Sequence, residues 1–246
     1  MNVAKKQKIS DAARATFQRG GLDYDAWQPG VVPLFALISE FPLNVTELTG
    51  CNRRLTARRA VNEISRKAQI DLPEADNPDA ALSGFLYAYQ FADCLDAWMF
   101  TEKAEPTVRR RYSAAHEFGH YLLHFTPLLE QYAGSDFLIL TEGVYFGEAA
   151  DNTEPAAQIK AVQDFDAQEP LALPDLWEME EEANQFAAEL LLPRNACLNA
   201  AEVYARKLGA RRAVIAHRLA SEFFVSFAAM HRRLTDLEFF RVADKN

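Results

Sequence analysis

The stretch AAHEFGHYLLH, residues 114–124, decides how the rest of the chain is interpreted. It holds three of the five histidines, His116, His120 and His124, and Glu117 follows the first of them. Residues four apart on an α-helix are offset by only about 40°, so the rings of His116 and His120 can reach one metal ion. Glu117 lies about 100° around the helix, where it can reach a water on that metal without being a ligand. The H-E-x-x-H pattern therefore predicts a zinc hydrolase with Glu117 as its general base.

A catalytic zinc ion takes three protein ligands and keeps one position for water, so a third ligand is needed. His124 comes only four residues after the second histidine, and one straight helix cannot easily wrap three ligands around one ion. We interpret His124 as a core residue or as a residue behind the ligands. The segment EMEEEANQFAAELLLP, residues 178–193, is the better source. Relative to its apolar face, Glu180 lies about 60° and Glu182 about 100° away, so we predict Glu180, with Glu182 as the alternative.

Three blocks of this sequence resemble the ImmA/IrrE family of metallopeptidases, and they occur in the same order. They are RRRYSAAHEFGHYLLH (109–124), EEEANQFAAELLLP (180–193) and FFVSFAAMHRRLTDL (223–237). The resemblance covers roughly residues 80–240. It implies a zincin-like, gluzincin-type core that binds one Zn²⁺ per chain through His116, His120 and Glu180, with Glu117 as the base.

The resemblance also implies partners for this site. In gluzincins such as thermolysin, a polar residue four positions after the glutamate ligand orients a ligand histidine, and Asn184 has this spacing from Glu180. Family members described as anti-repressors cleave helix-turn-helix repressors, which implies a protein substrate of that class and a role in transcription regulation. A donor to the oxyanion is also required. His231, His217 and Tyr112 are candidates, and the sequence does not choose among them.

The pattern of apolar residues predicts an α+β fold, mostly helical around a small β-sheet. Residues 84–102 are aromatic and apolar, which indicates two strands. Residues 136–149 resemble a hairpin that turns at Glu142-Gly143, and residues 44–67 are expected to form one or two helices. The helix that carries the histidines is expected to end at Pro127.

We divide the chain into three segments. Residues 1–75 form a helical region of unknown role, residues 76–193 form the metallopeptidase core, and residues 194–246 form a helical, helix-turn-helix-like segment. Residues 126–176 are an acidic insertion with ten acids and one base. This insertion is either a solvated loop or a segment that folds against basic surface, such as Arg109, Arg110 and Arg111, and holds the enzyme latent.

The rest of the chain indicates a cytoplasmic protein with no membrane partner. The first residues lack the apolar run of a signal peptide, and no apolar run of about 18 residues could span a bilayer. The three cysteines, Cys51, Cys94 and Cys197, are far apart and form no metal-ligand pair.

Two other functions remain open. A DNA-binding regulator could use residues 219–237, with Arg232 and Arg233 in the second helix, or residues 44–64 with their arginine cluster. Packed helices with solvated arginines explain both segments more simply, so nucleic acid is not the favoured partner. A non-catalytic interaction protein could instead hold a structural zinc, although such sites usually need four protein ligands.

Overall fold

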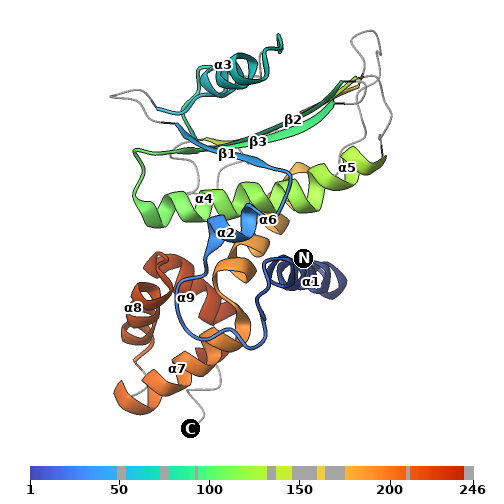
Figure 1. The fold of residues 1–246 in the computed structure, drawn as a ribbon. Coiled ribbons are helices and arrows are strands. Elements are labelled where there is room, and N and C mark those ends of the chain that lie inside the picture. Colours follow the sequence, from blue (N-terminus) through green and yellow to red (C-terminus); the bar gives the residue numbers. More distant parts are fainter. Residues whose placement is uncertain are drawn as a thin grey trace. The chain divides into compact units, whose positions relative to one another are not determined.

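The computed structural model describes residues 1–48, 54–72, 78–91, 94–131, 137–145, 160–163, 175–208 and 211–240 (Figure 1). The chain forms two compact units. The sheet unit contains residues 41–184 with Met1, and the helical unit contains residues 2–40 and 185–246. These units divide the chain at different positions from the three segments expected above. The N-terminal region is split after residue 40 because its first part clusters with the C-terminal helices and its second part with the sheet.

The sheet unit is built on a mixed five-stranded sheet with the order β1-β3-β2-β4-β5. Its elements are β1 (Asn44–Leu48), α3 (Ala57–Ala68), β2 (Leu82–Phe91), β3 (Cys94–Glu102), α4 (Thr107–His120), the π-helix η1 (Tyr121–Phe125), α5 (Thr126–Gln131), β4 (Phe137–Tyr145), β5 (Lys160–Gln163) and the first part of α6 (Leu176–Leu191). β1 is parallel to β3, and the other neighbours are antiparallel. The α+β class and the two strands within residues 84–102 are therefore confirmed.

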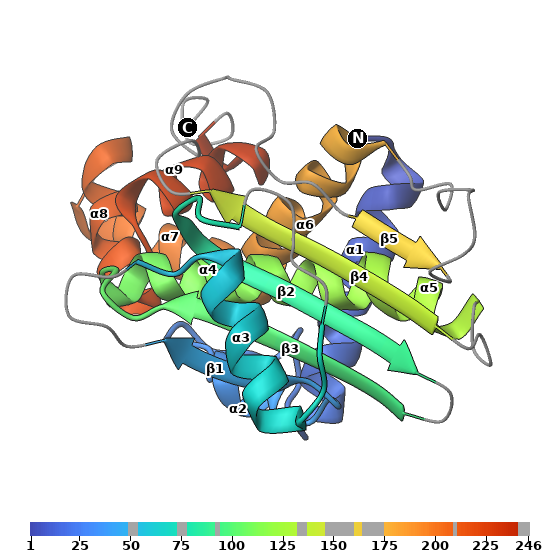
Figure 2. The same ribbon diagram turned by 90° about the horizontal axis from the view of Figure 1, so that it is seen from above.

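The two faces of the sheet are covered by different helices (Figures 1 and 2). On one face, α3 inserts Val61 and Ile64 into a core that includes Tyr87, Tyr89 and Phe100. Thr56 precedes α3 as its N-cap, and its side chain accepts a hydrogen bond from the backbone N–H of Arg59. On the opposite face, α4 packs against β2, β3 and β4. The histidine-bearing helix is thus held between the sheet and α6.

Three local expectations were wrong for tertiary reasons. The stretch 44–48 is a strand, not a helix, because it pairs along its whole length with β3. β4 is one continuous strand through Glu142-Gly143, because β2 offers it an unbroken antiparallel partner there. Pro127 does not end the helix, since residues 107–131 stay helical through the π turn. Pro127 lies at the second position of α5, directly after the π turn of residues 121–125.

The helical unit consists of α1 (Val3–Arg19), α2 (Leu34–Ile38), α7 (Arg194–Leu208), α8 (Arg212–Phe223), α9 (Phe227–Asp236) and the end of α6. A buried ion pair stabilises it: the guanidinium of Arg233 donates to both carboxylate oxygens of Glu189, at 2.9 and 2.6 Å. Tyr24 also donates to Glu189, at 2.7 Å. Arg233 is only 2% exposed, which argues against the less favoured alternative that this arginine contacts DNA.

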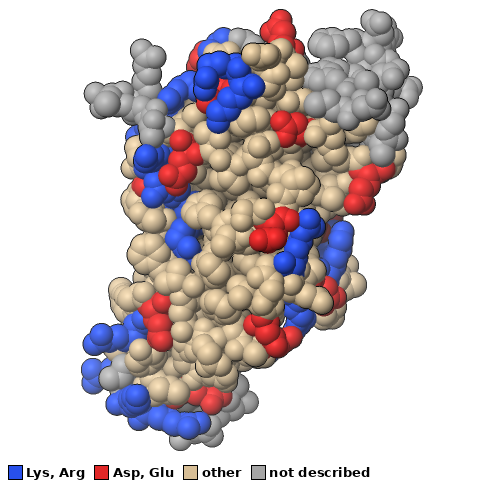
Figure 3. Space-filling view, viewed as in Figure 1, with Lys and Arg blue, Asp and Glu red and all other residues tan. Residues whose placement is uncertain are grey.

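Helices α8 and α9 meet at 113°, within the range of helix-turn-helix pairs. Phe224, in the left-handed region, ends α8, and the Ser226 side chain caps α9. Basic side chains gather near the end of α7 and over α8 (Figure 3), and Arg206, Lys207, Arg211, Arg212 and Arg218 are exposed there. In the described part of the chain, no single helix has the length and apolar character to cross a bilayer. Among the described helices, α8 and α9 taken together as a bent pair pass the same test of length and composition.

Candidate metal centre

Helix α4 places His116, Glu117 and His120 in the interior of the sheet unit. Their side chains are nearly inaccessible, with residue exposures of 4%, 0% and 0%. Burying three polar side chains this close together costs free energy unless each has a polar partner. Their burial on one helix therefore indicates a functional site. The i, i+4 spacing of the two histidines puts both rings on the same side of α4, with their centroids 4.7 Å apart.

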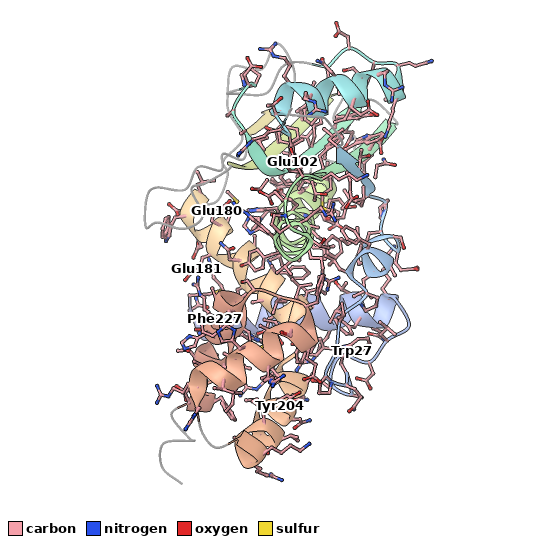
Figure 4. All side chains as sticks on the ribbon, turned by 90° about the vertical axis from the view of Figure 1, so that its left-hand side faces the viewer. Trp27, Glu102, Glu180, Glu181, Tyr204 and Phe227 are labelled. Atoms are coloured by element: carbon pink, nitrogen blue, oxygen red, sulfur yellow. The ribbon has the colours of Figure 1, made fainter. Side chains whose placement is uncertain are left out.

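Glu180 of α6, which is labelled in Figure 4, contacts both histidines of α4. Its Oε2 lies 3.4 Å from Nε2 of His116, and its Oε1 lies 3.2 Å from Nε2 of His120. The two Nε2 atoms are 3.1 Å apart. One ligand atom from each residue therefore lies within 4.8 Å of the other two, close enough for all three to share a metal ion. Glu181, the next residue, is 48% exposed and lies outside this group.

The protonation of this group suits metal binding. Burial lowers the pKa of His120 to about 4, so its ring is neutral at pH 7 and has a lone pair to share. Burial works to raise the pKa of Glu180, but hydrogen bonds from His116 and His120 outweigh it and hold that pKa well below its usual range. Two imidazoles and one carboxylate form the ligand set of known catalytic zinc sites. The residues present thus fit a zinc ion.

Glu117 lies against the central strand of the sheet. Its carboxylate occupies the space that a side chain at Gly84 of β2 would fill, since a Cβ there would meet Oε1 of Glu117 at 2.2 Å. The pairing of β2 with β4 shifts register between Leu82 and Gly84, so Ser83 forms a bulge beside this contact. Gly84 was not among the site residues expected from the sequence. The available signal was a glycine inside a strand, which often marks a close approach.

His124 does not join the three-residue group. Its Nδ1 lies 3.0 Å from Nδ1 of His120, and its Nε2 lies 3.3 Å from Oε2 of Glu182. Both ring nitrogens therefore face other side chains. Glu182, the alternative third ligand, is directed to His124, while Glu180 takes the position beside the two α4 histidines.

Asn184 has a different partner from the one expected. Its Oδ1 accepts a hydrogen bond from the hydroxyl of Tyr112, at 2.9 Å, where the sequence had suggested a ligand histidine. Tyr112 is one turn before His116 on α4, and Asn184 is one turn after Glu180 on α6. The Tyr112–Asn184 bond therefore joins the two helices one turn away from the candidate metal ligands.

The remaining candidates, His217 and His231, belong to the helical unit. Their rings form a row with Phe227 and Phe240: His217 stacks on Phe227 at 4.2 Å, and His231 lies 5.6 Å from Phe227 and 5.4 Å from Phe240. This aromatic packing accounts for both histidines without a role in catalysis. Their assignment as oxyanion donors stays a prediction.

The arginines at the start of α4 do have acidic partners. Arg109 pairs with Glu105, and Arg110 pairs with Glu47, each at 3.3 Å. These ion pairs offset the unfavourable position of cations at a helix N-terminus. The partners come from adjacent structure, and most of the acidic stretch 126–176 lies outside the described residues.

Comparison with known proteins agrees with these features. The model of peptidase family M78, described as an IrrE N-terminal-like domain, matches residues 173–235, about a quarter of the chain. The matched segment contains Glu180 and extends through α7 and α8 into α9. No curated protein matches the chain. The match supports an ImmA/IrrE family protein of the metallopeptidase type, and the structure places Glu180 of the matched segment beside the two histidines of α4.

Proposed function

We propose that this protein is a zinc-dependent endopeptidase that cleaves a cytoplasmic regulator protein of the helix-turn-helix repressor class and so relieves repression. The observation that carries the proposal is the convergence of His116, His120 and Glu180, with Glu117 buried on the same helix. The substrate class rests on the family resemblance. The H-E-x-x-H hydrolase chemistry rests on the residues themselves.

A zinc ion held by these three residues would polarise the scissile carbonyl and lower the pKa of the attacking water. As the general base, Glu117 would take a proton from the attacking water and deliver it to the leaving amine. Its burial against Gly84 fixes the carboxylate in one place and keeps bulk water away from it.

The metal is tested first. Mass spectrometry of the full chain after zinc is supplied should give one zinc per chain, and His116→Ala or Glu180→Ala should abolish it. Glu181→Ala is the matched control, because this exposed neighbour on α6 lies outside the group and should leave the zinc content unchanged. Absence of zinc from the unaltered chain would overturn the proposed function.

The hydrolase role is tested with Glu117→Gln, which keeps the size of the side chain and removes the base. The variant should retain zinc and lose proteolysis. Newly created protein N-termini, compared in cells that carry either form, should include cleavage products of a helix-turn-helix regulator only with the unaltered chain. A variant that retains zinc and every biological function would support the alternative of an interaction protein with a structural zinc.

An oxyanion donor completes the proposal, and Tyr112 is the candidate on α4 itself. Its hydroxyl is engaged with Asn184, so it must change partner when substrate binds. Removal of one oxyanion donor typically lowers kcat by about 10²–10³-fold, and Tyr112→Phe should have this effect with zinc content unchanged. If kcat is unchanged, Tyr112 is not the oxyanion donor, and its role is limited to the hydrogen bond with Asn184 that links α4 to α6.

DNA binding is the less favoured alternative. Within residues 219–237, Arg233 is committed to the buried pair with Glu189. Within residues 44–64, the N-terminal part is a strand, and Arg58 pairs with Asp79 at 2.8 Å. A gel-shift assay should therefore detect no complex with a steep salt dependence, which is the signature of phosphate neutralisation.

A further inference from the structure

The ring of His120 has a second nitrogen, Nδ1, that the proposed metal site does not use. Its Nε2 faces Glu180 and His116, whereas its Nδ1 lies 3.0 Å from Nδ1 of His124. On the far side of His124, Nε2 lies 3.3 Å from Oε2 of Glu182. A continuous row thus runs from the candidate metal ligand through a second imidazole to a carboxylate. His120 is 0% exposed and His124 is 6% exposed, and the side chain of Glu182 is 14% exposed.

The positions of the protons along this row follow from one requirement. A histidine that gives the Nε2 lone pair to a metal must carry its proton on Nδ1. The neighbouring atom is Nδ1 of His124, which must then accept, so His124 carries its own proton on Nε2. That proton points to the carboxylate of Glu182, which accepts it. A neutral imidazole has one N–H and one lone pair, so His124 can accept at Nδ1 while it donates at Nε2.

The helix geometry around His124 supports this arrangement. Residues 121–125 form a π turn, in which the backbone N–H and the side-chain hydroxyl of Thr126 both donate to the carbonyl oxygen of Tyr121. Such turns are rare and occur often at functional sites. Here the π turn carries His124 directly after the two candidate ligands. It also lets the helix continue into α5 without a break.

We propose that His124 and Glu182 are positioning residues that hold His120 in the Nδ1-protonated tautomer and thereby set the affinity of the site for zinc. The inference rests on the proposed zinc function. A ligand histidine usually donates its second N–H directly to a carboxylate, a carbonyl oxygen or water. In this chain the carboxylate acts through an intervening imidazole.

The test measures zinc dissociation constants of the full chain by competition with a chromophoric chelator. Loss of such outer partners typically weakens metal affinity by about 10–100-fold, which we expect for His124→Phe and Glu182→Leu. His124→Gln should retain most of the affinity, because its amide oxygen can accept from His120 while its NH₂ donates to Glu182. Glu181→Leu is the matched control on the same helix and should bind zinc as the unaltered chain does.

A second measurement separates positioning from a general effect on folding. In the zinc-loaded protein, the Nδ1–H of His120 should give a slowly exchanging imidazole proton signal by NMR, kept in His124→Gln and lost in His124→Phe. Zinc affinity of His124→Phe within about twofold of the unaltered chain, with the fold intact, would overturn the inference and leave the proposed function standing. Equal losses in the Gln and Phe variants would also overturn it, as expected if His124 bound the metal itself. Failure of the unaltered chain to bind zinc would instead overturn the proposed function.

Discussion

The substitution Gly84→Ala should disable the proposed base while leaving the metal ligands in place. A Cβ at this position would lie 2.2 Å from Oε1 of Glu117, and real Cβ atoms essentially never come closer than 3.0 Å to a neighbour. Either the carboxylate or β2 must therefore move by about 0.8 Å. A misplacement of about 1 Å can cost roughly 10²-fold in rate, so we expect kcat to fall by that order. The crowding should also cost about 1–3 kcal/mol of stability.

The assay compares kcat, zinc content and urea unfolding of four forms: the unaltered chain, Gly84→Ala, Glu117→Asp and the double variant. Aspartate withdraws the carboxylate by one methylene, so Gly84→Ala should destabilise the Glu117→Asp chain much less than the unaltered one. Gly20→Ala is the matched control, because its Cβ would meet the end of the flexible Leu37 side chain, at 2.5 Å, away from the metal group. Full kcat in Gly84→Ala, or the same loss of stability in both backgrounds, would refute the reasoning.

Two further changes test the scaffold. Glu189→Gln leaves the charge of Arg233 buried and unpaired, so the free energy of unfolding should fall by about 3–5 kcal/mol. Burial works to raise the pKa of Glu189, but the hydrogen bond and charge of Arg233 outweigh burial, so the pKa in the folded state is lowered. The stability that the ion pair contributes is therefore present at neutral pH and is lost as pH falls through this lowered pKa. Urea unfolding against pH checks both points, and Glu202→Gln, an exposed control, should change little. Ile64→Ala should cost about 2–5 kcal/mol with zinc content unchanged, since Ile64 lies on the opposite face of the sheet from α4; loss of zinc would contradict this.

Local sequence patterns were sufficient where one element decides the outcome. The H-E-x-x-H spacing places His116 and His120 on one side of a helix whatever surrounds it. The apolar face of α6 likewise set the direction of Glu180, and the structure brings its carboxylate to both histidines. The aromatic pattern of residues 84–102 indicated the β2–β3 pair for the same reason, because alternation along a strand is a local property.

Local patterns failed where the partner is distant in the sequence. The apolar spacing of Val45 and Leu48 fits a helix, but pairing with β3, some fifty residues later, made this segment a strand. The apparent turn at Glu142-Gly143 was overridden in the same way, because β2 pairs straight through it. From the sequence, Arg233 was a candidate DNA contact. In the structure it forms a buried ion pair with Glu189, 44 residues away in the sequence.

The sequence by itself therefore determined which chemical groups each helix offers: two imidazoles and a carboxylate on one helix, and a second carboxylate on another. Only the tertiary structure decided how these groups are held. In the folded protein Glu117 packs against Gly84, Nε2 of His124 lies beside the carboxylate of Glu182, and Asn184 accepts a hydrogen bond from Tyr112. Each of these contacts joins residues more than thirty positions apart. Helical and strand periodicity specify the side of an element on which a residue lies, whereas the packing of the elements specifies which residue it meets.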